Sequence, residues 1–151
     1  MKIPIDKNRK WVANLHNSIE QLPEEQKASI MKQAGANCTN DLLKLCESFS
    51  GRQIDNIKDL VSGWNILRDS RNLEGKWEIK NNIAHAIFNE CGCPLVRSGM
   101  IELHPIQCLC SQGMMETIFS NVAKRAVRVE IKRAICRGDS ACEYIITICD
   151  C

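Results

Sequence analysis

The chain of 151 residues has little net charge, few aromatic side chains and no long apolar run. Its 20 basic and 18 acidic residues leave a formal charge of +2, so its charge favours neither nucleic acid nor an anionic membrane surface. The basic group at 124–133 contains no aromatic residue, which argues against binding of single-stranded nucleic acid there. Because no apolar run reaches the length of about eighteen residues that a bilayer requires, we expect no membrane-spanning segment.

The first 22 residues lack the continuous apolar core and the small-residue cleavage site of a secretory signal, so we expect a cytoplasmic protein. Cytoplasmic thiols are kept reduced. Ten cysteines therefore indicate metal or thiol chemistry rather than a disulfide framework. The G-x-S-x-G and H-E-x-x-H motifs and glycine-rich phosphate loops are all absent, so the sequence carries no motif of an ordinary hydrolase or nucleotide-binding site.

The first half of the chain has helical periodicity. Apolar residues recur at three- and four-residue steps from Trp11 to Leu22, and Pro23 followed by two glutamates suits the first turn of a second helix. Thr39 or Asn40 can cap a third helix, and Asp55 a fourth. The pattern predicts four helices, at 11–22, 23–35, 39–51 and 55–67.

From residue 76 onward the pattern changes to strands around one helix. Residues 76–91 alternate and are rich in β-formers, with a turn at 81–82. Ser111 is expected to open a helix, and Gly138 with Asp139 supplies the turn between two final strands. We therefore predict one α+β domain over 1–151, helical at 7–70, with an antiparallel sheet and a helix packed between strand pairs at 76–149.

Four cysteines form two closely spaced pairs, Cys91 with Cys93 and Cys108 with Cys110, separated by fourteen residues. Two thiols at positions i and i+2 can converge on one ion in a strand or loop, whereas in a helix they diverge, so we expect both pairs outside helices. This spacing approximates the two-knuckle zinc pattern with one residue, instead of two, inside each pair. It predicts a zinc site made of these four thiolates.

Other interpretations of the same thiols stay open. They can form a redox or nucleophilic cluster, or pack as buried apolar side chains. An iron–sulfur cluster ranks below zinc because the usual cluster spacings are absent. Cys38, at a predicted helix start, is the better fifth metal ligand, whereas we expect Cys46 to pack in the core. Cys136 and Cys142 flank the last turn and are expected to approach each other across it.

The three histidines are more simply explained without a metal. His104 is expected to be an exposed loop residue, His85 a strand residue satisfied by its neighbours, and His16 a solvent-facing residue of the first helix.

Among the acidic residues, Glu90 beside Cys91 is the better acid or base candidate. Glu116 and Glu130 are weaker, since Glu130 alternates with apolar residues as on a solvated sheet face.

The last third, with Gly138, Asp139, Cys142 and Tyr144, resembles the closing segment of 4-vinyl-reductase-type domains. That superfamily is similar to small-molecule sensor domains and includes tethering-complex subunits. Its sensors bind zinc through cysteines and a glutamate. Here Ala134 stands where those sensors place a second cysteine, and only Cys108 falls near their early one.

Over residues 10–149 the chain, with "MKQAGANCTNDLL" and the C-x-C pairs, resembles a cysteine-rich bacterial and archaeal family of uncharacterised function that is similar to aminothiazoline-carboxylate hydrolases. We therefore expect a metal- and small-ligand-binding domain of sensory type. A metal- or thiol-dependent hydrolase of a small amide or thiazoline is the alternative. A small-molecule ligand is the expected partner, nucleic acid and membranes are not, and a homodimer is left open.

Overall fold

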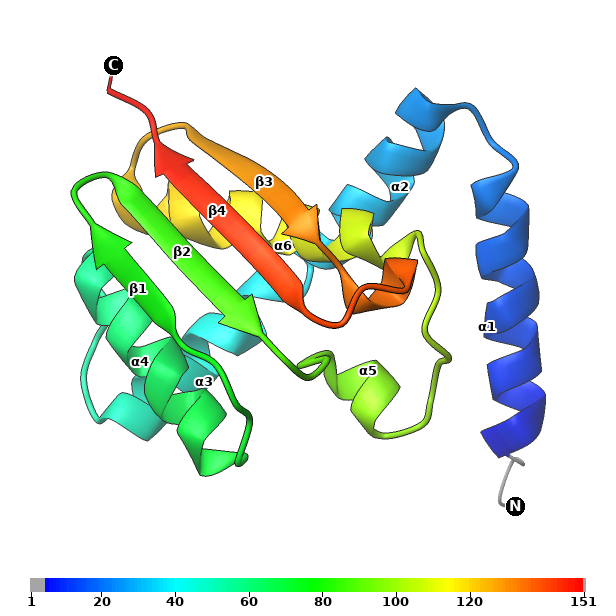
Figure 1. Ribbon diagram of the computed structural model, residues 1–151, viewed down its shortest axis with the longest axis horizontal. Helices are drawn as coiled ribbons and strands as arrows, with labels where there is room; N and C mark the ends of the chain where they lie inside the picture. The colour runs from blue at the N-terminus through cyan, green and yellow to red at the C-terminus, as the bar shows by residue number, and fades with distance from the viewer. Residues whose placement is uncertain (1–4, 151) are drawn as a thin grey trace.

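The computed structural model describes residues 5–150 and consists of helices followed by a mostly β second half (Figure 1). The first half forms α1 (Ile5–Glu20), α2 (Glu24–Ala36), α3 (Thr39–Ser50) and α4 (Ile57–Ser70). The second half forms β1 (Trp77–Lys80), β2 (Ile83–Phe88), α5 (Pro94–Arg97), α6 (Gln107–Ala123), β3 (Val127–Arg133), the 3₁₀ helix η1 (Ile135–Arg137) and β4 (Cys142–Ile148). The predicted α+β class is confirmed.

The four strands form one antiparallel sheet in the order β1-β2-β4-β3. Side chains alternate across it, so Ala84, Ala86 and Phe88 of β2 are buried while Ile83 and Ile87 are exposed. Helices α4 and α6 lie behind the sheet in Figure 1, and none of the helices in the described part of the chain covers the face turned to the viewer. The predicted turn at 81–82 is confirmed, with Asn81 in the left-handed region at φ 56°.

The core lies between the sheet and helices α3, α4 and α6. Trp77 is its centre: its ring lies 5.2 Å from those of Trp64 and Phe119 and 5.7 Å from that of Phe88, measured between centroids. Cys46 is fully buried among these elements, as predicted. The few aromatic residues of this chain are therefore concentrated at one point, where each buries a large apolar area.

Helices α2 and α6 cross at unusually short distance because each carries a glycine at the crossing. A Cβ on Gly35 of α2 would collide with the backbone carbonyl of Cys110, and a Cβ on Gly113 of α6 would collide with the backbone of Lys32. These glycines are needed for close approach rather than for backbone freedom. The crossing places the end of α2 directly beside the first turns of α6.

Helix α1 stands at the far side of α5 from the sheet (Figure 1). It is tied to the α5 segment by the Arg9 side chain, whose Nε donates to the Gly99 carbonyl at 2.9 Å. Among residues 5–150, no helix has the length and hydrophobicity needed to cross a membrane.

Three helix starts differ from the prediction. The N-cap of α3 is Cys38, not Thr39 or Asn40, and no side chain caps this helix. Helix α6 begins at Gln107, not at Ser111, so Cys108 and Cys110 lie inside its first turn and not in a loop or strand. The prediction was wrong because Ser111 has the chemistry of a cap, whereas the residue at the observed cap position, Ile106, has an apolar side chain that accepts no capping hydrogen bond. Helix α4 is capped by Asn56, not Asp55: the Asn56 Oδ1 accepts from the Asp59 N–H at 3.0 Å.

Candidate functional site

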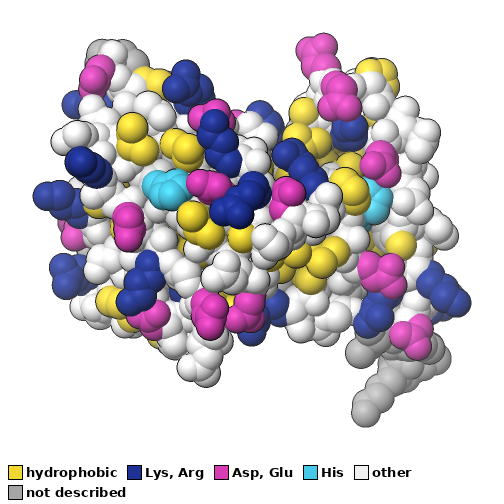
Figure 2. Space-filling model, viewed as in Figure 1, with side chains coloured by type: hydrophobic (Ala, Val, Ile, Leu, Met, Phe, Trp, Pro, Cys, Tyr) yellow, Lys and Arg dark blue, Asp and Glu magenta, His cyan; other side chains and the backbone are white. Residues whose placement is uncertain are grey.

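A cavity of about 560 Å³ lies between α1, the end of α2, the α5 segment, the start of α6 and the ends of β3 and β4. Most of its lining is aliphatic, with Val12, Ile30, Leu103 and Ile135 contributed by four of these segments. No aspartate, glutamate, lysine or arginine is among its lining residues in the described part of the chain. In Figure 2 hydrophobic side chains are visible in the hollow between the sheet and α1.

The cavity collects the predicted thiols. All five cysteines predicted as metal ligands line it: Cys38, Cys91, Cys93, Cys108 and Cys110. Cys136 and Cys142 line it as well. The sequence analysis therefore placed the right residues around one space, although it did not place Cys136 and Cys142 in that group.

Three helix starts and one loop position these thiols. Cys38 is the residue before α3, Cys93 the residue before α5, and Cys110 lies in the first turn of α6. Cys91 follows β2 in the loop that leads to α5. The Pro94 ring starts α5 directly after Cys93, because proline suits the first helical position. The Cys38 N–H donates to the Gly35 carbonyl at 3.0 Å, which holds this thiol beside the α2–α6 crossing.

Two of the lining cysteines are bonded to each other. Cys108 of α6 forms a disulfide with Cys136 of η1. This corrects the expectation that Cys108 is a free thiolate, and it shows that the bonding partner of Cys136 is Cys108 and not Cys142. The Cys142 Sγ instead accepts from the Ile135 N–H at 3.4 Å. The disulfide joins residues 28 positions apart, which the spacing of the cysteines does not reveal.

The zinc site has no geometric support in this structure. Within residues 5–150, no group of three or more histidine, cysteine, aspartate or glutamate side chains is arranged to hold a metal ion. One reason is that Cys108 and Cys110 lie two positions apart on a helix, where side chains point about 200° apart. Zinc binding by these cysteines stays a prediction.

Burial keeps three of the remaining thiols in their protonated, uncharged form. It raises the pKa of Cys110 to about 11, with nearby Cys38 and Cys93 adding to the effect. Burial likewise raises the pKa of Cys38, where Cys93 adds to the effect, and the pKa of Cys91. Near neutral pH these thiols therefore add no charge to an uncharged cavity.

A polar group on β4 lies at the sheet side of the cavity. The Tyr144 hydroxyl hydrogen-bonds with the side chains of Ser111 and Cys142, and burial raises the pKa of this phenol. Such a hydroxyl can orient a ligand that carries one polar atom. The sequence analysis noted Tyr144 only through the family resemblance. The alternation of β4 was the signal that could have placed it on the inner face.

Two histidines join α1 to the loop after α5. The ring of His16 lies 5.4 Å from that of His104, and the His104 Nε2 lies 3.1 Å from the Asn17 Oδ1 and 3.3 Å from a Glu20 carboxylate oxygen. Burial, with a contribution from His104, lowers the pKa of His16. The predictions that His16 faces solvent and that His104 is an exposed loop residue were wrong: His16 lines the cavity and His104 packs against α1.

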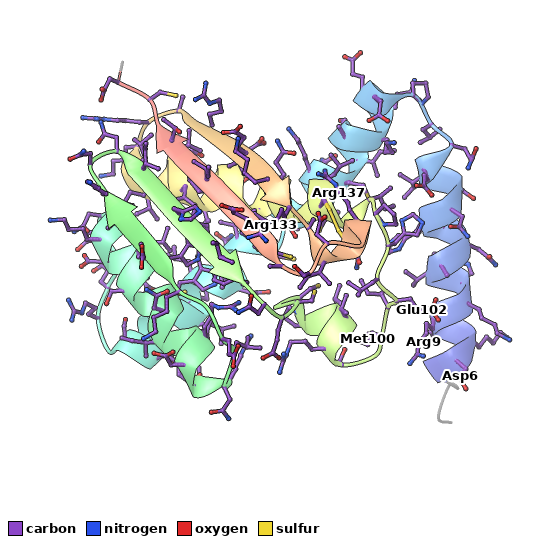
Figure 3. All side chains as sticks on the ribbon, in the orientation of Figure 1. Asp6, Arg9, Met100, Glu102, Arg133 and Arg137 are labelled. Carbon is purple, nitrogen blue, oxygen red and sulfur yellow. A yellow bond between two sulfur atoms is a disulfide. The ribbon has the colours of Figure 1, made fainter. Side chains whose placement is uncertain are left out.

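His85 behaves as predicted. It lies in β2, and its Nε2 is 2.9 Å from the Glu143 Oε1, while the Glu143 Oε2 accepts from the Arg133 Nε at 3.0 Å. These groups lie on the uncovered face of the sheet, where Figure 3 labels Arg133.

The acidic candidates do not line the cavity. Glu90 lies 3.7 Å from the Arg97 guanidinium, Glu116 lies 3.1 Å from the Lys32 ammonium, and Glu130 lies 2.9 Å from the Lys132 ammonium. Each is therefore engaged in an ion pair outside the cavity, and none is placed to act on a molecule bound there.

Comparison with known proteins supports the fold. No protein-family model and no curated protein sequence matches the chain. Several solved structures do, among them these three. The phenol-responsive sensory domain of the transcription activator PoxR, with phenol, has a TM-score of 0.62 and 10% identity, covering 93% of this chain and 74% of that one. An H-NOX protein from S. oneidensis in the Fe(II)NO ligation state has a TM-score of 0.60 and 13% identity, covering 99% and 78%.

The third structure is trafficking protein particle complex subunit 3 from Naegleria fowleri, covalently bound to palmitic acid, with a TM-score of 0.54 and 13% identity, covering 97% of this chain and 95% of that one. The chain has the fold of these proteins. At such low identity the likeness concerns the fold alone. The resemblance to 4-vinyl-reductase-type domains and to aminothiazoline-carboxylate hydrolases stays a prediction.

Proposed function

We propose that this chain is a small-ligand-binding domain of sensory type, and that its cavity holds one uncharged, largely apolar molecule. The observation that carries the proposal is a cavity of about 560 Å³ whose lining contains no charged residue type among the described positions. Cavities of roughly 300–1,000 Å³ with mostly apolar walls and a few polar groups are typical of small-molecule sites. A charged ligand would lose its hydration there without finding a partner.

The fold comparisons support the same class of ligand. The matched PoxR domain is phenol-responsive, and the matched tethering subunit is covalently bound to palmitic acid. In this chain the Tyr144 hydroxyl and Ser111 offer a hydrogen-bonding point at one end of an otherwise aliphatic space. A neutral molecule with an apolar body and one hydroxyl group fits both features.

Calorimetric titration with phenol and with 1-octanol tests the proposal. We expect saturable 1:1 binding of at least one of them and a rise in melting temperature, because a ligand that binds only the folded state adds about 2.7 kcal/mol at one hundred times its Kd. Ala34→Phe fills the cavity from α2 and is expected to weaken binding at least tenfold. Gln33→Phe adds the same ring one residue away, outside the cavity lining, and serves as the matched control.

Equal affinity in the two phenylalanine variants, or no binding of either probe, contradicts the proposal.

The predicted binding of zinc by these cysteines is tested in a separate experiment. Metal content per chain and the melting temperature after chelation would reveal a site that needs Cys91, Cys93 and Cys110 to move, and Cys108 to be released from its disulfide. The hydrolase alternative has no carboxylate on the cavity lining within the described residues.

A further inference from the structure

Three cysteines from three separate segments line the cavity. Cys38 precedes α3, Cys93 precedes α5 and Cys110 lies in the first turn of α6. Gly35 packs directly against the carbonyl of Cys110, and the N–H of Cys38 donates to the carbonyl of Gly35, so the backbones of Cys38 and Cys110 lie close together. Cys93 interacts electrostatically with both. We refer to Cys38, Cys93 and Cys110 as the thiol triad.

The surroundings of the triad favour an uncharged, polarisable atom that binds sulfur over a metal cation. The cavity lining offers no aspartate, glutamate, lysine or arginine at the described positions to balance a charge. A zinc ion would need four ligands, yet no group of three suitable side chains within residues 5–150 is arranged to hold a metal ion. A three-coordinate metalloid that already carries one organic substituent needs only two protein sulfurs.

We infer that the cavity binds neutral molecules that carry a trivalent arsenic centre on an apolar group, and that two thiols of the triad bond to that centre. The inference rests on the proposed function, because it names a ligand class for the same cavity. Sulfur is the protein ligand that soft centres prefer. The apolar substituent would occupy the aliphatic space lined by residues such as Val12, Ile30 and Leu103.

The bonding step balances without an oxidant or a reductant. An organoarsonous acid, R–As(OH)₂, meets two thiols; two As–O bonds and two S–H bonds break, and two As–S bonds form. The two protons leave with the two hydroxyl groups as two molecules of water, and arsenic stays trivalent. Both reactants and both products are neutral, which suits an interior without counter-charges. The second As–S bond closes within one molecule, and its high effective concentration slows release.

Titration with phenylarsine oxide, which hydrates to such an acid, tests the inference by intact-protein mass and thiol count. We expect one adduct per chain, the loss of two titratable thiols, and competition with whichever of phenol or 1-octanol binds. The variant carrying Cys38→Ser, Cys93→Ser and Cys110→Ser is expected to lose at least a hundredfold in affinity. Cys149→Ser, outside the cavity lining, is the control and should change affinity less than twofold. A 4-carboxyphenyl analogue should bind at least tenfold more weakly, since the cavity offers no cation.

Adduct formation that persists in the triple variant, or equal affinity for the phenyl and carboxyphenyl compounds, would overturn the inference. Because the triple variant must be shown to be folded, its retained binding of the phenol or 1-octanol probe is measured in parallel. If those probes bind the native chain and phenylarsine oxide does not, only this inference fails. If neither kind of compound binds, the proposed function fails with it. Stoichiometric zinc on the triad, with no arsenic adduct, also overturns it.

Discussion

Cys108 in the first turn of α6 is covalently joined to Cys136 in η1, so a helix start and the turn between the last two strands form one continuous wall of the cavity. Neither α6 nor η1 begins with a side-chain cap, although η1 is held locally by the Ala134 N–H, which donates to the Asp139 Oδ2 at 2.8 Å. The disulfide adds a covalent link across 28 residues to hydrogen bonds that each span only a few.

Breaking this bond should cost stability only under oxidising conditions. A closed loop of 28 residues corresponds to about 3.6 kcal/mol of chain entropy in the unfolded state. Cys136→Ser is therefore expected to lower the free energy of unfolding by about that amount without reductant, and by less than about 1 kcal/mol with dithiothreitol present. Urea unfolding in both buffers measures the difference, with Cys149→Ser as the control. An equal loss in the two buffers would show that Cys136 acts through packing alone.

The close crossing of α2 and α6 should not tolerate a methyl group. A Cβ at Gly113 meets the backbone of Lys32, which cannot move as a flexible side chain can. We expect Gly113→Ala to lower the free energy of unfolding by about 3 kcal/mol, at the upper end for an overpacked site. Gly51→Ala is the control: its Cβ would meet nothing within 4 Å, and only its left-handed backbone, φ 69°, costs about 1 kcal/mol. Equal losses in the two variants would contradict the packing argument.

Arg68 is a buried cation whose role is structural. It is 4% exposed, its guanidinium carbon lies 3.5 Å from the centroid of the Phe88 ring, and its Nη2 donates to the Glu74 carbonyl at 2.7 Å. Burial lowers the pKa of this guanidinium. Lysine cannot reproduce both the planar stacking and the donation, so Arg68→Lys is expected to cost about 2 kcal/mol in thermal or urea unfolding. Arg71→Lys, one turn on in the same helix region, should cost less than about 0.5 kcal/mol.

Stability should fall as the pH drops below the ordinary histidine value, and His16 should cause part of the fall. Burial and the nearby His104 lower the pKa of His16 below 6.5 in the folded chain. As the pH falls from 6.5 towards that lowered pKa, the unfolded chain takes up a proton at His16 that the folded chain does not. The free energy of unfolding therefore decreases in this range, whereas above about pH 7.5 His16 leaves it unchanged. The titratable and polar groups that face the two histidine rings are Asn17 and Glu20, both within 3.3 Å of the His104 Nε2.

His16→Gln removes the titrating group and should flatten this dependence. Urea midpoints measured at pH 5.5 and pH 7.5 give the comparison, and the variant should lose less stability between them than the native chain. A variant that loses as much as the native chain would assign the pH dependence to other groups.

Local patterns in the sequence were enough to predict the order of elements. The three- and four-residue apolar steps gave the early helices, and the alternation after residue 76 gave the strands and the turn at Asn81. Cys46 was correctly expected in the core. These features depend on neighbours within a few residues, where side-chain periodicity and backbone preference act directly.

The start of α6 and the pairing of Cys108 with Cys136 were not predictable in this way. Ser111 has the local chemistry of a cap, but the helix begins four residues earlier, after the buried Ile106, whose side chain offers no cap. A disulfide across 28 residues depends on how η1 is placed against α6, and cysteine spacing alone does not contain that information.

By itself, the sequence determined the α+β class and showed that the cysteines carry the distinctive chemistry of this chain. Only the tertiary structure decided that seven of them face one uncharged cavity, that two of them are bonded, and that α1 closes one side through His16 and His104. The physical reason is the distance along the chain over which each kind of interaction acts. Helix and strand formation follow from interactions over a few residues, whereas a cavity exists only where segments distant in the chain pack and leave space between them.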